Sequence, residues 1–195
     1  MKNKILSFLI IFFCTLIISS CHKDSPTDTN VVDKLSIVPI KVGNSWSYSG
    51  TSYDTLGSII ETFGERMDVS KDSLISNVRY FLYNGFLSVD TDTGLVSIVG
   101  QSKKYYYKYP VVIGEKYHSL FHDCYISSVD TVIQVSVGAF HCVRYEKFNG
   151  SIRIGVDFVS PGMGMIKHIG YYSFLSGKDD QRVFDSTALS SFLLK

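Results

Sequence analysis

The sequence predicts an all-β domain, an antiparallel meander that forms a strongly curved sheet or open barrel with little helix. Tyr and Phe, which favour strands, occur 13 times each, whereas Pro occurs only 4 times. Turns of the Asn-Gly type at Asn84-Gly85 and Asn149-Gly150 separate apolar runs, as in β-hairpins. No long segment has the 3.6-residue periodicity of an amphipathic helix. We expect at least ten strands, and open sheets of about that size tend to curl or close.

The first half of the domain contains the patterns of five strands. They are Trp46–Tyr53, Ile59–Val69, Arg79–Tyr83, Phe86–Val89 and Lys103–Tyr109. Asn84-Gly85 joins the third to the fourth, because both turn positions tolerate positive φ. The segment Asp90–Gly94 begins like a calcium loop but is not followed by the Glu that such a loop needs at its twelfth position. We interpret it as a tight turn between strands.

The second half of the domain contains the patterns of five more strands, which we expect to form a meander. They are Val129–Val137, Ala139–Phe148, Ile152–Val159, Met165–Phe174 and Arg182–Leu194. Ser160–Met163 has the Pro and Gly of a β-turn at its second and third positions.

The turns of this meander also predict which residues face each other. A turn at Asn149-Gly150 would place Glu146 opposite Arg153 and Tyr145 opposite Ile154. The hairpin before it puts Cys142 on the core face, whereas this hairpin puts Tyr145 there. We therefore expect a bulge between these positions that switches the face.

The two cysteines of the domain are predicted to be separate thiols, although export would permit a disulfide. A turn at Val137-Gly138 places Cys142 opposite Ile133 and Cys124 opposite Ser151. The cysteines would then lie roughly 30 Å apart at 3.3 Å per residue. A disulfide requires Cα atoms closer than about 7 Å. We expect Cys142 to be a small core residue.

The N-terminus has the layout of a secretory signal. A basic start, Met1–Lys4, precedes the apolar run Ile5–Ile18, which is too short to span a bilayer comfortably. The small residues before Cys21 resemble a bacterial lipobox, which implies cleavage before Cys21 and lipidation of its thiol. An ordinary cleaved signal and a retained membrane anchor are the alternatives. We expect a signal peptide over residues 1–20, a lipidated polar tether over 21–37 and one β-rich domain over 38–195.

The net charge argues against a nucleic-acid partner. Without Lys2 and Lys4, the mature chain has 17 basic and 18 acidic residues. Such a chain has no basic excess that would attract nucleic acid or anionic lipid head groups.

Several segments resemble those of small exported lipoproteins of the Bacteroidota type. They are Pro39–Tyr48, Val137–Cys142 and Pro161–Lys167, which contain Val-Gly-Asn-Ser-Trp, Val-Gly-Ala-Phe-His-Cys and Pro-Gly-Met-Gly-Met-Ile-Lys. The resemblance implies a lipid anchor in the cell envelope. We expect the outer membrane, and both its periplasmic and its surface side stay open. The group implies no activity, so no catalytic residue or cofactor is carried over.

A histidine-rich segment is the best metal candidate in the chain. His118, His122 and Cys124 have suitable ligand atoms. On a strand, however, the two histidines would lie about 13 Å apart, too far to chelate one ion. We therefore expect polar histidines at the rim and no metal site.

A tyrosine-rich strand is the candidate ligand surface. Tyr105, Tyr107 and Tyr109 would share one face, with Lys104 and Lys108 on the other. Either the tyrosines form a core face backed by lysines, or they form an exposed ladder that binds sugar or peptide.

Three function classes stay open. The leading one is a non-enzymatic envelope lipoprotein that binds a protein, glycan or lipid partner or stabilises an assembly. The second is a carrier of a lipid or other apolar ligand inside the curved sheet. The third is a hydrolase whose residues assemble only in space, which a pocket with a strongly shifted His or carboxylate would favour.

Overall fold

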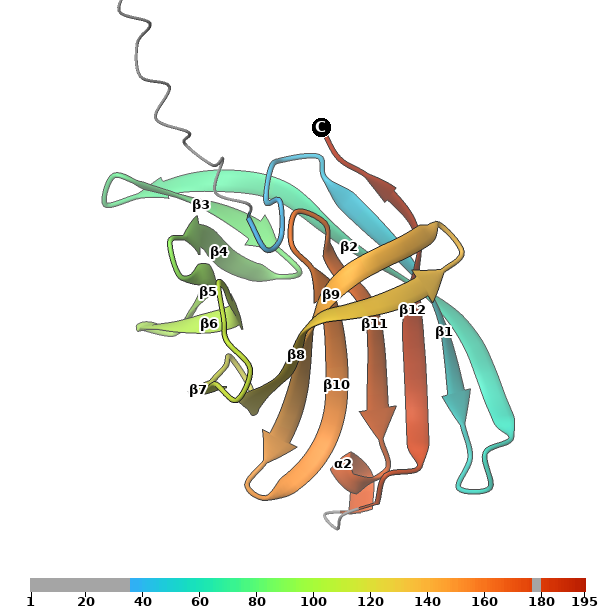
Figure 1. Cartoon of the computed structure of the whole chain (residues 1–195). Helices are drawn as coiled ribbons and strands as arrows, with labels where there is room; N and C mark the ends of the chain where they lie inside the picture. Colours follow the sequence, from blue (N-terminus) through green and yellow to red (C-terminus); the bar gives the residue numbers. More distant parts are fainter. Residues whose placement is uncertain (1–35, 177–179) are drawn as a thin grey trace, which may run out of the picture. The chain divides into compact units, whose positions relative to one another are not determined.

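A computed structural model describes residues 36–176 and 180–195 of the chain. It contains one antiparallel sheet of twelve strands, ordered β6-β5-β4-β3-β2-β1-β12-β11-β10-β9-β8-β7 (Figure 1). The strands are β1 Ser45–Tyr53, β2 Ile59–Ile75, β3 Val78–Tyr83, β4 Phe86–Thr91, β5 Gly94–Val99, β6 Ser102–Lys108, β7 Lys116–His118, β8 Asp123–Val135, β9 Gly138–Asn149, β10 Ile152–Ser160, β11 Gly164–Tyr171 and β12 Val183–Leu193. Sequential strands are neighbours except β6 and β7, which form the two edges of the sheet, and β1 also pairs with β12.

The sheet curls until its two edges approach each other. Beside the edge strands β6 and β7, Tyr105 and Ser119 form an isolated bridge. The result is a nearly closed, barrel-like sheet, as predicted. The helix among the described residues is α2, Ser173–Ser176. In the described part of the chain, no helix has the length and apolar character needed to cross a membrane.

The predicted strands are all present, although their ends differ by several residues. The strand expected to run to Phe174 ends at Tyr171. Two strands were not predicted, β5 and the short β7. β5 begins at Gly94, the last residue of the segment that we interpreted as a turn, and Thr91 pairs with Gly94 across the turn. That interpretation is confirmed.

The Asn84-Gly85 hairpin is confirmed. Tyr83 lies opposite Phe86, and the two turn residues have φ of 46° and 81°. Such positive φ values are what Asn and Gly tolerate best in a two-residue turn.

The register predicted for the β8–β9 hairpin is wrong. The turn is Ser136-Val137, so Cys142 lies opposite Thr131 instead of Ile133. Gly138 has φ of 141° and occupies the first ladder position of β9 instead of a turn position. Further register shifts within β8 place Cys124 opposite Lys147, not Ser151. The prediction that the two cysteines are separate thiols nevertheless holds, because Cys124 and Cys142 are buried free thiols.

The register predicted for β9 and β10 is also wrong. Asn149 lies opposite Ile152, and a bulge after Arg153 then places Tyr145 opposite Asp157 instead of Ile154. The predicted ion pair survives this shift, since Arg153 Nη1 lies 3.4 Å from Glu146 Oε2.

The bulge that we expected between Cys142 and Tyr145 lies at this level of the β8–β9 pair, but in the partner strand, where the register shifts between Ser128 and Thr131. Cys142 and Val143, which are neighbours in β9, are both buried.

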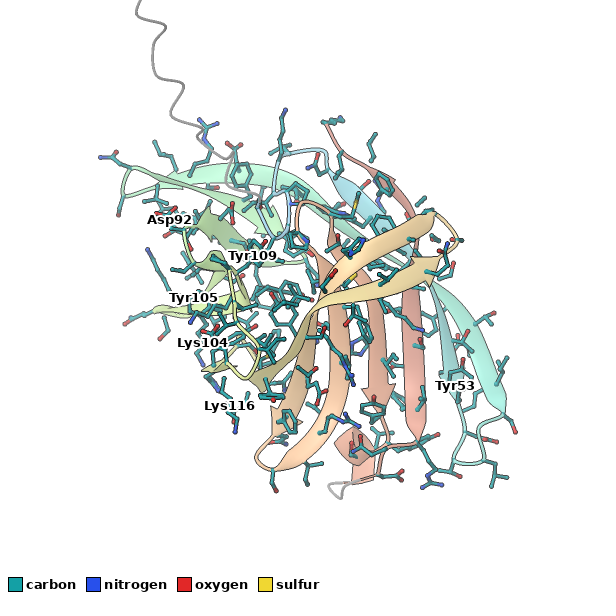
Figure 2. The ribbon with its side chains drawn as sticks, in the orientation of Figure 1. Tyr53, Asp92, Lys104, Tyr105, Tyr109 and Lys116 are labelled. Atoms are coloured by element: carbon teal, nitrogen blue, oxygen red, sulfur yellow. The ribbon has the colours of Figure 1, made fainter. Side chains whose placement is uncertain are left out.

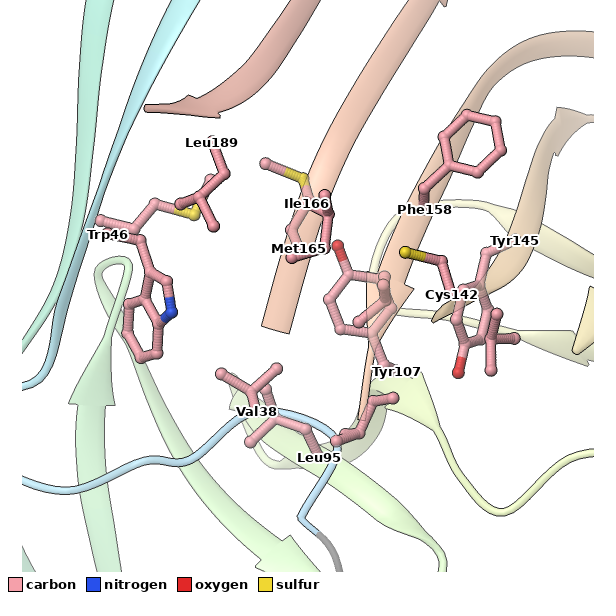
Figure 3. Packing of buried hydrophobic residues seen from close by; sticks show 14 of the residues in the cluster. Val38, Trp46, Leu95, Tyr107, Cys142, Tyr145, Phe158, Met165, Ile166 and Leu189 are labelled. Atoms are coloured by element: carbon pink, nitrogen blue, oxygen red, sulfur yellow. The ribbon is translucent and has the colours of Figure 1, made fainter. Parts of the chain in front are cut away.

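Apolar side chains from strands around the sheet pack together in one core (Figure 3). They include Ile37, Val38, Trp46, Leu95, Tyr107, Tyr145, Met165, Ile166 and Leu189. Trp46 Nε1 donates to the Met163 carbonyl at 2.6 Å, and Tyr48 Oη donates to the Met165 carbonyl at 3.0 Å. These bonds satisfy the polar atoms of two large buried rings and tie β1 to the β10–β11 hairpin and the start of β11. Ile37, just before the predicted domain start at Val38, belongs to this core.

Candidate functional site

Polar residues from four neighbouring strands meet on the inner face of the sheet. Pairing aligns Lys147, Gly155, Gly170 and Asp185 across β9, β10, β11 and β12. The adjacent row on the same face contains Tyr145, Asp157, His168 and Thr187, because side chains two residues apart point the same way.

Asp157 is the centre of this polar group. Its side chain is 1% exposed. Oδ2 accepts from Tyr107 Oη at 2.7 Å and lies 2.6 Å from Lys147 Nζ, while Oδ1 lies 2.6 Å from His168 Nδ1. Tyr107 comes from β6, so these contacts place Asp157 inside the barrel.

The buried pair of Asp157 and Lys147 is charged. Burial alone would raise the pKa of Asp157, but Lys147 and His168 together hold that pKa well below its usual range. Burial would likewise lower the pKa of Lys147, but the Asp157 carboxylate raises it. Each charge is stable only because the other is present.

This arrangement orients the imidazole of His168. Because Asp157 is ionised, the hydrogen bond at Nδ1 places a proton on that nitrogen of the ring. Nε2 lies 3.7 Å from Asp185 Oδ1. That oxygen is buried without a hydrogen-bond partner among the described residues.

Two glycines keep the space beside these groups open. A Cβ on Gly170 would lie 2.1 Å from Asp185 Oδ1, and one on Gly155 would lie 2.9 Å from the Ile169 carbonyl oxygen. The resulting hollow, the glycine pocket, has a volume of about 280 Å³. Its lining residues are His122, Lys147, Ile154, Gly155, His168, Gly170, Tyr171, Phe184 and Asp185.

A smaller cavity of about 60 Å³ adjoins the glycine pocket. His122 and Lys147 line both spaces. Burial, and next the positive charge of Lys147, lower the pKa of His122. The His122 ring is therefore a neutral polar group at the boundary of the two spaces.

The predicted tyrosine surface does not form as one ladder. Tyr107 is 4% exposed and lies in the core, whereas Tyr105 and Tyr109 are half-buried near β6 (Figure 2). The cause is a register shift against β5, where Leu95 pairs with Tyr107 but Val96 pairs with Tyr105. Tyr107 therefore belongs to the interior polar group, and ligand binding by Tyr105 and Tyr109 stays a prediction.

The histidine segment is split between two environments. His118 lies on β7, where its Nδ1 is 2.8 Å from Asp123 Oδ1 at an exposed position. His122 instead lines the glycine pocket, and Cys124 is buried. Within residues 36–176 and 180–195, no three His, Cys, Asp or Glu side chains are placed to hold a metal ion.

The predicted lipidation site, Cys21, lies outside the described residues, as do the signal peptide and most of the tether.

A larger hollow, of about 510 Å³, is less suited to recognise a charged or polar ligand. It lies between the β1–β2 turn and strands β11 and β12, and its lining includes Asp54 and Arg182. Asp54 Oδ1 already accepts from two backbone N–H groups of its own turn. Arg182 already pairs with Asp180 at 2.6 Å.

Sequence reasoning missed the interior polar group. One signal was available, since Asp157 interrupts the otherwise apolar segment 154–159. A charged residue at such a position requires a partner. The partners lie on β6, β9 and β11, so only the register reveals them.

Comparisons with known proteins identify no family for this chain. No family model matches it, and the search of curated proteins finds no match. Among solved structures, a crystal structure of a candidate lipoprotein from Parabacteroides distasonis is similar, with 12% sequence identity and a TM-score of 0.43. The match covers 82% of this chain and 99% of the other. A similarity this low says nothing about activity.

Proposed function

We propose that this chain is a lipid-anchored protein of the cell envelope whose barrel binds a small polar molecule in the glycine pocket without converting it. The observation that carries this proposal is the combination of open space with oriented polar groups. A fixed network holds Lys147 and His168 beside a floor without side chains. Such preorganised polar groups in a concave site are typical of ligand recognition.

The lining favours a polar ligand over an apolar one. Apolar side chains of the core, including Trp46 and Leu95, already pack against one another inside the barrel. The glycine pocket is instead lined by the polar side chains of Lys147, His168 and Asp185. A lipid tail would leave Asp185 Oδ1 without water or a partner, at a cost of several kcal/mol in order of magnitude.

Binding also fits the site better than hydrolysis. A shifted carboxylate is present, but the oxygens of Asp157 already take up three donors. Asp157 therefore positions Lys147 and His168 instead of transferring protons itself. The described lining of the pocket contains no Ser, Thr or Cys that could serve as a nucleophile.

The anchor part of the proposal rests on the N-terminal sequence. The apolar run Ile5–Ile18 and the small residues before Cys21 support lipidation and export. The outer membrane is the proposed destination, and the polar stretch after Cys21 would tether the barrel to it.

Saturation-transfer NMR on full-length protein in detergent micelles tests the binding function. The probes are glucose, glycine, ethanolamine and acetate at about 10 mM, a concentration that detects millimolar affinities. We expect at least one probe to bind wild type and not Gly170→Ala, in which the new Cβ displaces Asp185. Gly64→Ala is the matched control, because its Cβ would meet only the Tyr48 carbonyl oxygen at 3.9 Å. If no probe binds, or if Gly170→Ala binds like wild type, the proposal is wrong.

A further inference from the structure

The chemistry of the glycine pocket restricts its ligand further, and this inference rests on the proposed function. One end of the pocket contains a buried acceptor without a partner. Asp185 Oδ1 lies 3.7 Å from His168 Nε2 and has no hydrogen-bond partner among the described residues. A buried acceptor without a donor is costly. The ligand must therefore supply a donor at this end.

The other end presents donors. An ammonium group has three N–H donors, and Lys147 Nζ has one partner in the described structure, Asp157 Oδ2 at 2.6 Å. The Lys147 side chain lines the pocket, although it is mostly buried at 23% exposure. Gly155 and Gly170 lie between the two ends. Three strand spacings separate Lys147 from Asp185, or roughly 14 Å between their Cα atoms. The ligand must accept near Lys147 and donate near Asp185.

Hydroxyl groups meet both requirements, because each donates one hydrogen bond and accepts two. An ammonium ligand only donates, so it offers no acceptor to the donors of Lys147. A carboxylate ligand only accepts, and Asp185 repels it. A zwitterionic ligand gains less binding free energy than its two charges suggest, because Asp157 already neutralises Lys147. Neutral hydroxyl groups avoid each of these conflicts.

The remaining walls suit a compact ring. Tyr171 and Phe184 place aromatic rings in the lining, and Ile154 adds an aliphatic contact. The glycine floor lets a ligand approach the backbone closely. We infer that the glycine pocket binds a neutral polyhydroxylated molecule of monosaccharide size, with one hydroxyl donating to Asp185 Oδ1 and another accepting from Lys147 Nζ.

Calorimetric titration of full-length protein in detergent tests this assignment. The probes are the neutral sugars glucose, galactose, mannose and xylose, together with glycine, ethanolamine and acetate. We expect at least one sugar to bind and the three charged probes not to bind. Asp185→Asn replaces a carboxylate oxygen by an N–H₂ group, so sugar affinity should fall about tenfold or more. Asp130→Asn, which alters an exposed carboxylate beside His141, should leave affinity unchanged.

The outcomes separate the two proposals. If glycine, ethanolamine or acetate binds through this pocket and no sugar does, the ligand class is wrong while the binding function stands. If sugars bind but Asp185→Asn, folded by circular dichroism, binds as tightly as wild type, the assigned contacts are wrong. If none of the seven probes binds, both proposals fail.

Discussion

Removing the carboxylate charge of Asp157 should destabilise the barrel strongly. Asp157→Asn keeps the shape of the side chain but leaves Lys147 as a buried ammonium without its counterion. Breaking a buried ion pair by removing one partner costs about 3–5 kcal/mol of unfolding free energy. With a urea m-value of about 2 kcal/mol/M, the unfolding midpoint should fall by roughly 1.5–2.5 M. Urea titration followed by Trp46 fluorescence and circular dichroism measures this shift.

Asp130→Asn is the matched control for this experiment. Asp130 also bonds a histidine, His141, but the two side chains are 70% and 75% exposed. Exposed pairs contribute about 0–1 kcal/mol, so the midpoint should move by about 0.5 M or less. If the unfolding midpoint of Asp157→Asn lies within about 0.5 M of the midpoint of this control, the reasoning about the buried ion pair is refuted.

The pH dependence of stability checks the same reasoning with a definite sign. The pKa of Asp157 is lowered by folding, so its contribution is present above its ordinary pKa of about 3.9 and is lost as pH falls further. Wild type should therefore lose its advantage over Asp157→Asn below about pH 4. An advantage of Asp157 that grows under acid conditions would contradict this interpretation.

Three further predictions follow from other parts of the molecule. Burial raises the pKa of the Cys142 thiol to about 12, and Cys124 is also buried. A thiol reagent should therefore label both cysteines slowly in the native protein at about pH 8 and quickly in urea. Fast labelling of the native protein would contradict this prediction. Trp46→Phe should lose about 1–3 kcal/mol of stability, measured by urea titration, because it leaves the half-buried Met163 carbonyl without its donor and removes part of a buried ring; an unchanged midpoint would show that this bond contributes nothing. Cys21→Ser should abolish incorporation of labelled fatty acid, and persistent label in the variant would place the lipid elsewhere.

The sequence by itself determined the fold class and most of the strands. Alternating apolar residues and turns such as Asn84-Gly85 are local signals, since a strand's pattern and a two-residue turn depend on neighbours along the chain. The separation of Cys124 from Cys142 was also predictable, because the cysteines lie on different parts of one hairpin whatever its register.

Only the tertiary structure decided the register and therefore the site. Bulges such as the one after Arg153 shift the pairing of β9 and β10, and a single-residue shift changes which side chains meet. The partners of Asp157 lie on β6, β9 and β11, so no local pattern brings them together. The tyrosine strand shows the same limit, because a shift against β5 buries Tyr107 and leaves Tyr105 half-buried. Bulges depend on how the whole barrel packs, which sequence spacing does not encode.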